Sequence, residues 1–335
     1  MGSQQNALHQ LVSFILGASA AAVLIFFLTS ASSGARFTEI SSWANGTTAF
    51  DDHPDEELER LLRAVADEDR TVIMTSVNEA WAAEDSLLDL FLESFRTGEK
   101  ISHFASHLLV VCARRRRPRA VPRRAPALLP PPVRRRPQPL RREGVHEPGL
   151  PRPGLEQGPA PAEDLELGYN FLFTDVDILW FRNPFERMSV AAHMVTSSDF
   201  FFGDPYSPMN LPNTGFLYVK SSKRTVGAFE AWRAAREAYP GKHEQQVLNE
   251  IKHELVATRG LRIQFLDTEH NAGFCNNTRD FNTLYTMHAN CCVGLGAKLN
   301  DLGNLLQEWR AYRQMDDEER SRGPVRWKVP GICIH

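Results

Sequence analysis

The stretch that most constrains this chain is an aromatic-rich run containing two aspartates. Residues Leu165–Phe185 read LELGYNFLFTDVDILWFRNPF, and the alternating aromatic side chains predict a buried strand. Asp175 and Asp177 follow, and a spacing of two on a strand points both carboxylates to one face. Because apolar residues lie on both sides and unpaired buried charge is costly, we expect the pair to bind a cation. The alternative is a strand-end turn with a chance D-x-D, since short motifs are weak evidence alone.

The middle of the chain has a composition that excludes a packed fold. Residues 113–163 contain 13 Arg and 13 Pro. The rest of the chain carries 25 basic and 37 acidic residues, which argues against a nucleic-acid-binding body. The ordinary interpretations of such a segment are a disordered linker or a basic interaction tract.

The residue types of this segment favour a third interpretation. It uses only Ala, Arg, Pro, Val, Leu, Gln, Glu, Gly and His, all of which have codons that begin with C or G. A GC-rich gene read one base out of frame would give this alphabet, which begins after Cys112 and ends before Tyr169. We therefore hypothesise a frameshifted reading of folded sequence, restored near Leu165. In that case the sheet lacks a part, and the activity of this chain is in doubt.

The N-terminal region has the outline of a membrane anchor. Leu11–Thr29 is 19 residues without a charge, and as a helix it would span roughly 28 Å. A cleaved signal peptide, with small residues near Ala31–Ala35, and a core helix are the alternatives. Sequons at Asn45 and Asn276 agree with a lumenal body. Five cysteines are too few for a disulfide scaffold but compatible with one or two bridges in an oxidising lumen.

A strand–helix–strand pattern precedes the Arg/Pro segment. Residues 71–78 predict a strand that ends in Asn78, as a first nucleotide-binding strand does, residues 81–96 a helix, and residues 107–112 a second strand. Neither a dinucleotide fingerprint nor a P-loop follows the first strand. Four further elements are expected: strands at 213–219 and 263–266, a helix at 225–239, and a solvated helix at 309–319.

Later in the chain, Gly215, His288 and Lys298 are further site candidates. Gly215 could let the backbone approach a ligand, although an ordinary loop glycine is the alternative. A lone histidine is usually structural, but a metal held by two carboxylates needs more ligands, and His288 could supply one. Lys298 is a candidate phosphate contact, with a solvated lysine as the alternative.

Several motifs in order resemble one family. FTDVDILWFRNPF, NTGFLYVKS, YPGKHEQQVLNEIK, FLDT, GFC and TMHANCCVGL together are similar to the plant nucleotide-diphospho-sugar transferases, which resemble family 77 glycosyltransferases. The resemblance covers residues 56–112 and 165–335. It implies a type II Golgi membrane protein with a GT-A fold, a nucleotide-binding α/β sandwich with a mixed central sheet. It also implies a UDP-sugar donor, Mn²⁺ or Mg²⁺ as cofactor, and retention of anomeric configuration.

The resemblance also implies roles for individual residues. Asp175 and Asp177 match the D-x-D that binds ribose and metal, and His288 matches a histidine that completes the metal coordination. Asn213 and Gly215 lie in the turn that lines the sugar and acceptor side.

Departures from the family pattern affect three positions. Glu244, Gln245 and Gln246 stand where the family usually has Asp-Gln-Asp. Glu244 keeps a carboxylate and is our candidate for the catalytic one, Gln245 is expected to contact the nucleotide-sugar, and Gln246 loses a charge. Tyr285 replaces a cysteine common in the family, so one expected disulfide would be missing.

The sequence thus predicts a Golgi glycosyltransferase that moves a sugar, with pentoses such as xylose or arabinose favoured, to a cell-wall polysaccharide or glycoprotein. The alternative is an inactive, transferase-like lumenal protein. No nucleic-acid partner is expected. The predicted organisation is a tail (1–10), a transmembrane signal anchor (11–29), a stem (30–55), the first part of the GT-A domain (56–112), the Arg/Pro-rich disordered or frameshifted segment (113–164) and the rest of the domain (165–335).

The frameshift hypothesis predicts the result of sequencing the transcript across residues 105–170. We expect a second reading frame there that encodes strand- and helix-like sequence in place of Arg and Pro. An intact transcript that encodes the same Arg/Pro tract in frame would contradict the hypothesis.

Overall fold

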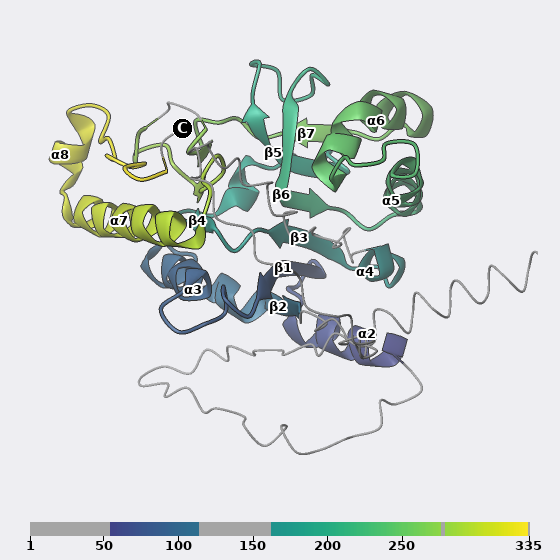
Figure 1. Cartoon of the computed structure of the whole chain (residues 1–335), viewed down its shortest axis with the longest axis horizontal. Helices are drawn as coiled ribbons and strands as arrows, with labels where there is room; N and C mark the ends of the chain where they lie inside the picture. Colours follow the sequence, from purple (N-terminus) through teal and green to yellow (C-terminus); the bar gives the residue numbers. More distant parts are fainter. Residues whose placement is uncertain (1–53, 114–161, 276–278, 334–335) are drawn as a thin grey trace, which may run out of the picture.

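Six strands form a mixed central sheet (Figure 1). The computed structural model describes residues 54–113, 162–275 and 279–333. β1 is parallel to both β2 and β3, whereas β3 and β6 are antiparallel. The prediction of an α/β fold with a mixed central sheet is confirmed. In sheet order the strands are β2 (Leu108–Ala113), β1 (Thr71–Asn78), β3 (Asn170–Thr174), β6 (Leu211–Val219), β5 (Met194–Phe200) and β7 (Ile263–Phe265).

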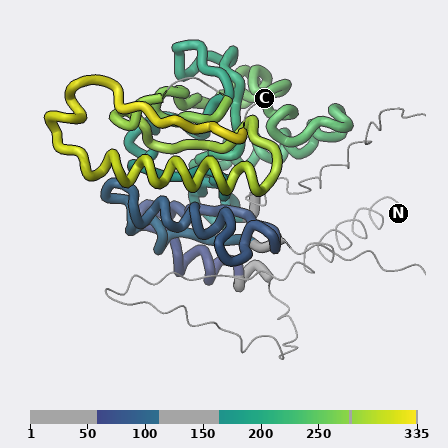
Figure 2. Tube along the Cα trace, turned by 60° about the vertical axis from the view of Figure 1, so that its left-hand side comes forward, coloured from purple at the N-terminus to yellow at the C-terminus, as the bar shows by residue number. Residues whose placement is uncertain are grey.

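Helices cover both faces of this sheet, as its strands require. In β1, Ile73 and Val77 are buried on one face and Val72 and Met74 on the other, so neither face can meet water. The first face packs against α3 (Leu87–Thr97) and α7 (Leu295–Gln314), and the second against α2 (Pro54–Val65), α5 (Lys223–Ala235) and α6 (Glu244–Arg259). Figure 2 shows α3 and α7 side by side.

A second, three-stranded sheet continues from the central one. It consists of β4 (Ile178–Trp180), β9 (Thr286–His288) and β8 (Asn271–Gly273), in that order. Trp180 is fully buried, and its ring lies 5.0 Å from Phe95. The apolar run predicted as one buried strand therefore forms two strands in two sheets, separated by a turn at residues 175–177.

Two helix predictions differ from the structure. The helix predicted from residue 81 begins at Leu87, because the Asn78 side chain accepts a hydrogen bond from Trp81 N at 3.0 Å and forms a turn first. The prediction of a solvated helix at 309–319 is wrong: α7 ends at Gln314, and Trp309 is fully buried. The remaining short elements are α4 (Ala162–Glu166), α8 (Asp317–Ser321), η2 (Ser102–His107) and η3 (Pro184–Arg187).

Several predictions fall outside the described residues. These are the anchor at 11–29, nearly all of the stem, both sequons and most of the Arg/Pro-rich segment. In the part of the chain that the structure describes, no helix combines the length and apolar character needed to cross a membrane. The strands that flank the Arg/Pro-rich segment in the sequence, β2 and β3, both pair with β1 and so belong to one described sheet.

Two disulfides tie the C-terminal third of the chain together. Cys275 is bonded to Cys291, and Cys292 to Cys333. Tyr285, which replaces a family cysteine, donates a hydrogen bond from its hydroxyl to Glu186 at 3.3 Å. The first bridge closes around the strand that carries His288.

We expect both bridges to stabilise the fold by restricting the unfolded chain. The Cys275→Ser/Cys291→Ser double variant should lose about 3 kcal/mol of unfolding free energy in urea titrations, since the closed loop spans 16 residues. The Cys292→Ser/Cys333→Ser variant, with a separation of 41, should lose roughly 0.8 kcal/mol more. A smaller loss for the longer loop would contradict the chain-entropy explanation.

Candidate metal centre

Asp175 and Asp177 lie in the turn that joins β3 to β4. Asp175 N donates to the carbonyl oxygen of Gly215 at 2.6 Å, and Ile178 N donates to the Asp175 carbonyl at 3.1 Å. Val176 between them is buried in the core. The two carboxylates thus share one side as predicted, but a turn brings them together rather than the alternation of a strand.

His288 reaches the same place through the pairing of β4 with β9. Ile178 is the register partner of His288, and Ala289 N donates to the Asp177 carbonyl at 3.0 Å. The His288 Nε2 atom lies 3.4 Å from Asp177 Oδ1 and 3.7 Å from Asp175 Oδ2. Ligand atoms of all three side chains lie within 4.8 Å of one another, so the group could hold a metal ion. Oxygen and imidazole ligands together suit Mn²⁺ and related divalent ions.

Lys298 adds a positive charge at the edge of this cluster. It lies in the first turn of α7, and its ammonium group forms an ion pair with Asp177 Oδ2. Its side chain is 20% exposed, whereas that of Asp177 is 8% exposed. The alternative of a freely solvated lysine is therefore wrong for the position of Lys298, although its contact with phosphate stays a prediction.

The surrounding charges shift the pKa values of the two carboxylates in opposite directions. Burial, followed by repulsion from Asp177, raises the pKa of Asp175 to about 6, even though 40% of its side chain is exposed. Burial opposes ionisation of Asp177, but the charge and hydrogen bond of His288, followed by Lys298, hold its pKa well below the usual range. Burial lowers the pKa of His288, but Asp177 outweighs it and the pKa lies above its ordinary value.

Gly215 permits the close approach of β6 to the acidic turn. A Cβ atom built at this position would overlap Asp175 Oδ2 and lie 2.9 Å from the His288 ring. The structure thus supports the prediction of close approach at Gly215, where the neighbours are the side chains of Asp175 and His288.

A further acidic residue, Asp199, organises the amides beside the cluster. Its Oδ1 accepts hydrogen bonds from Asn213 Nδ2 at 2.7 Å and Asn290 Nδ2 at 3.1 Å, and its Oδ2 accepts one from Gln245 Nε2 at 2.9 Å. Each amide oxygen in turn accepts from a backbone N–H, at Gly215, Cys275 and Thr214 respectively. The sequence analysis missed Asp199. Its position near the carboxyl end of β5 was the sequence feature that could have indicated a site residue.

The remaining predicted residues lie in different surroundings. Glu244 is the first residue of α6, and its Oε2 is buried without a hydrogen-bond partner among the described residues. Its charge contributes to the raised pKa of Asp175, which indicates that the two carboxylates are near each other. Asn78 ends β1 at the same sheet edge as the acidic turn, because β1 and β3 are parallel, but its Oδ1 is occupied by the local turn.

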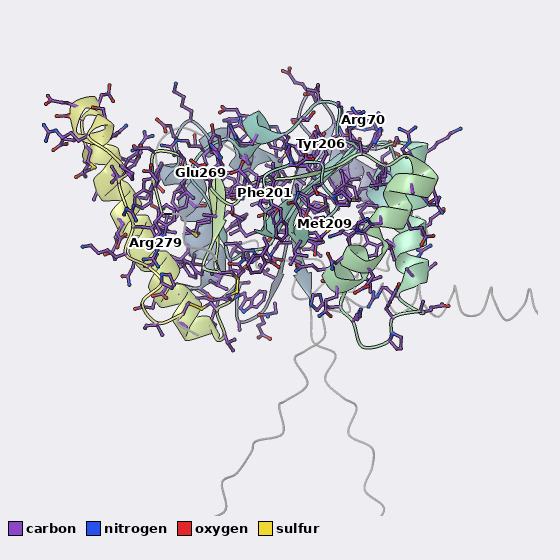
Figure 3. All side chains as sticks on the ribbon, turned by 90° about the horizontal axis from the view of Figure 1, so that it is seen from above. Arg70, Phe201, Tyr206, Met209, Glu269 and Arg279 are labelled. Carbon is purple, nitrogen blue, oxygen red and sulfur yellow. A yellow bond between two sulfur atoms is a disulfide. The ribbon has the colours of Figure 1, made fainter. Side chains whose placement is uncertain are left out.

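The connection between β5 and β6, which begins two residues beyond Asp199, carries exposed apolar side chains. Phe202, Tyr206 and Met209 are exposed on it, and Figure 3 labels Tyr206 and Met209. Asn210 braces the connection, since its Oδ1 accepts from Phe202 N at 2.7 Å and its Nδ2 donates to the Asp204 carbonyl at 2.7 Å.

Comparisons with known proteins agree on one family. The family model for nucleotide-diphospho-sugar transferases matches residues 163–302. The uncharacterized protein At4g15970 of Arabidopsis thaliana is 32% identical over 89% of this chain and 79% of its own length. The β-arabinofuranosyltransferase RAY1 of the same plant is 36% identical over 20% of this chain and 13% of its own length.

Among solved structures, similarity extends to a glycosyltransferase involved in the glycosylation of the major capsid of PBCV-1. The two are 11% identical, with 70% of this chain and 98% of that chain covered and a TM-score of 0.36. That similarity is too low to bear on the function.

The raised pKa values predict that metal binding depends on pH. A divalent ion binds the deprotonated forms of Asp175 and His288, so protons must leave both groups. As the pH falls below about 6, the Mn²⁺ affinity should fall by about tenfold per pH unit for each proton displaced. Titrating free Mn²⁺ by electron paramagnetic resonance between pH 5 and 7.5 tests this, and a constant Kd over that range would contradict it.

Proposed function

The chain belongs to the nucleotide-diphospho-sugar transferase family, and we propose that it transfers a glycosyl group from a UDP-sugar to a glycan acceptor. The observation that carries the proposal is the convergence of Asp175, Asp177 and His288 at the carboxyl end of β3. Ligands bind at this edge in open α/β sheets. The family match and the three converging side chains are independent lines of support.

The three side chains fit a divalent cation. They combine two carboxylates with an imidazole, and the buried Asp177 stays ionised at neutral pH. When bound, such an ion would neutralise the charge that develops on the departing diphosphate. We assign Asp177 and His288 as ligands and Asp175 as the residue that shares the metal or positions the ribose. Mn²⁺ or Mg²⁺ is the proposed ion.

Lys298 is placed to assist the same leaving group. Its ammonium group contacts Asp177 Oδ2 while part of its side chain remains exposed. A diphosphate bound beside Asp177 would therefore come within reach of the Lys298 ammonium group as well as the metal ion. We propose that Lys298 contacts a phosphate oxygen and exchanges its partner from carboxylate to phosphate when the donor binds.

The sugar and its acceptor are proposed to lie toward Asp199, Asn213 and Gln245. The amides held by Asp199 each have a remaining N–H or oxygen lone pair that could form a hydrogen bond with a sugar hydroxyl. The exposed connection between β5 and β6 begins two residues beyond Asp199. Glu244, with its buried unpartnered oxygen, is the proposed catalytic carboxylate of a retaining reaction. The GT-A assignment belongs to the same proposal.

The donor sugar is proposed to be a pentose. RAY1 is named a β-arabinofuranosyltransferase, and its similarity to this chain supports arabinose, with xylose as the other candidate. A cell-wall polysaccharide or glycoprotein is the proposed acceptor.

We propose that the protein acts in the Golgi lumen, anchored through residues 11–29 as a single-pass type II protein. Two disulfides within the described residues support an oxidising compartment, where such bonds persist. The uncharged N-terminal run supports the anchor.

A second candidate function is an inactive, transferase-like lumenal protein. The observation that favours it is the Arg/Pro composition of the segment between β2 and β3, which is incompatible with a packed continuation of the sheet.

The transferase proposal predicts that Asp177→Asn abolishes turnover. Hydrolysis of UDP-arabinose or UDP-xylose with Mn²⁺ should fall by at least about 10²-fold, because the variant loses the ligand charge closest to His288. Asp316→Asn, which alters an exposed helix cap far along the chain, is the matched control and should leave the rate unchanged. Equal rates for wild type and Asp177→Asn would contradict the proposed site, and a wild type without any turnover would favour the second candidate.

A further inference from the structure

A small polar cavity lies beside His288, and neither Asp175 nor Asp177 is among its lining residues. It has a volume of about 10 Å³, which is close to the room that one water molecule needs. Polar side chains from both sheets make up much of its wall: Ser197, Ser198, Asn213, Asn271, His288 and Asn290. A polar cavity of this size is suited to a single buried water rather than to a sugar.

Two buried atoms at this cavity have no hydrogen-bond partner among the described residues. They are His288 Nδ1 and Asn271 Nδ2. Asn271 is 97% buried, and its Oδ1 is already occupied by the Thr286 hydroxyl at 3.1 Å. Leaving a buried polar atom unsatisfied is destabilising, so both atoms need a hydrogen-bond partner.

The chemistry of the site makes both atoms donors. His288 presents Nε2 to Asp175 and Asp177, and a nitrogen that binds a metal carries no hydrogen, which leaves the proton on Nδ1. Two donors cannot satisfy each other, but one water oxygen can accept from both.

The wall also provides acceptors for the hydrogens of such a water. The Ser197 hydroxyl donates to the Asn213 carbonyl at 2.9 Å and the Ser198 hydroxyl to the Leu266 carbonyl at 2.8 Å. Their own hydrogens are therefore used, and their lone pairs are free to accept. A water here could make the full set of four hydrogen bonds.

We propose that this cavity holds one buried water that accepts hydrogen bonds from His288 Nδ1 and Asn271 Nδ2, and that Asn271 is thereby a positioning residue of the metal centre. The water keeps the His288 proton on Nδ1 and the ring turned so that Nε2 faces the carboxylates. The inference rests on the proposed metal site for the tautomer of His288 and for the effect on metal affinity. The cavity and its two unpartnered atoms are properties of the protein alone.

The water is tested by a crystal structure of the metal-free wild-type protein at about 1.5 Å resolution. We expect one ordered water within hydrogen-bond distance of both His288 Nδ1 and Asn271 Nδ2. A dry cavity, or a direct contact between the two side chains, would overturn the inference. This test needs no variant, so it holds even if substitutions prevent folding.

The positioning role is tested by Mn²⁺ binding to Asn271→Leu. This apolar side chain of similar size removes the donor and the room for the water, and the Mn²⁺ Kd should rise by roughly 10- to 100-fold. Asn271→Ser, whose hydroxyl can still donate a hydrogen bond to the water, should bind within about threefold of wild type. Thr75→Val removes another buried unpartnered oxygen and is the matched control, with no expected change.

The outcomes separate the two proposals. An unchanged Mn²⁺ Kd in folded Asn271→Leu would overturn the positioning role and leave the metal site standing. A wild type that binds no Mn²⁺ would contradict the metal site, and the crystal structure would still decide whether Asn271 and a water hold the His288 ring.

Discussion

The site depends on the antiparallel pairing of β4 with β9. This pairing sets His288 opposite Ile178, which directly follows Asp177. The two paired residues are 110 positions apart in the sequence. The buried ring of Trp180 on β4 and the disulfide that spans β9 hold the two strands in register. A shift of one residue would move the imidazole to the other face and separate it from both carboxylates. The candidate metal centre is therefore a consequence of strand register rather than of the D-x-D alone.

The charges around this pairing give each carboxylate a different character. Asp177 is buried between His288 and Lys298 and remains ionised, whereas Asp175 is partly exposed and is protonated more readily. A cation would replace the attraction that His288 and Lys298 now supply to Asp177. Lys298 would then be free to meet a phosphate. Under the proposed function, the same arrangement would hold Asp177 ionised in the metal-free protein and prepare the site for a charged donor.

Local patterns predicted most of the central elements, whereas long-range contacts defined the site. The bounds of β1 followed from its β-branched run, and the acidic pair followed from its apolar flanks. The division of the run into β3 and β4 could not be predicted, because both halves are equally apolar and only their partners differ. Trp309 was assigned to a solvated helix because charged neighbours surround it, yet it packs against Phe181 and Phe281. The role of Asp199 could not be predicted, because the three amides that it binds lie from 14 to 91 residues away in the sequence.

The most direct test of the central claim is the binding of UDP measured by calorimetry with and without Mn²⁺. If Asp175, Asp177 and His288 hold an ion that bridges to the diphosphate, Mn²⁺ should tighten UDP binding by at least about tenfold, and UDP should tighten Mn²⁺ binding by the same factor. Equal UDP affinity in the presence and absence of Mn²⁺ would contradict the account. Such a result would show that the three side chains do not act as a nucleotide-linked metal centre.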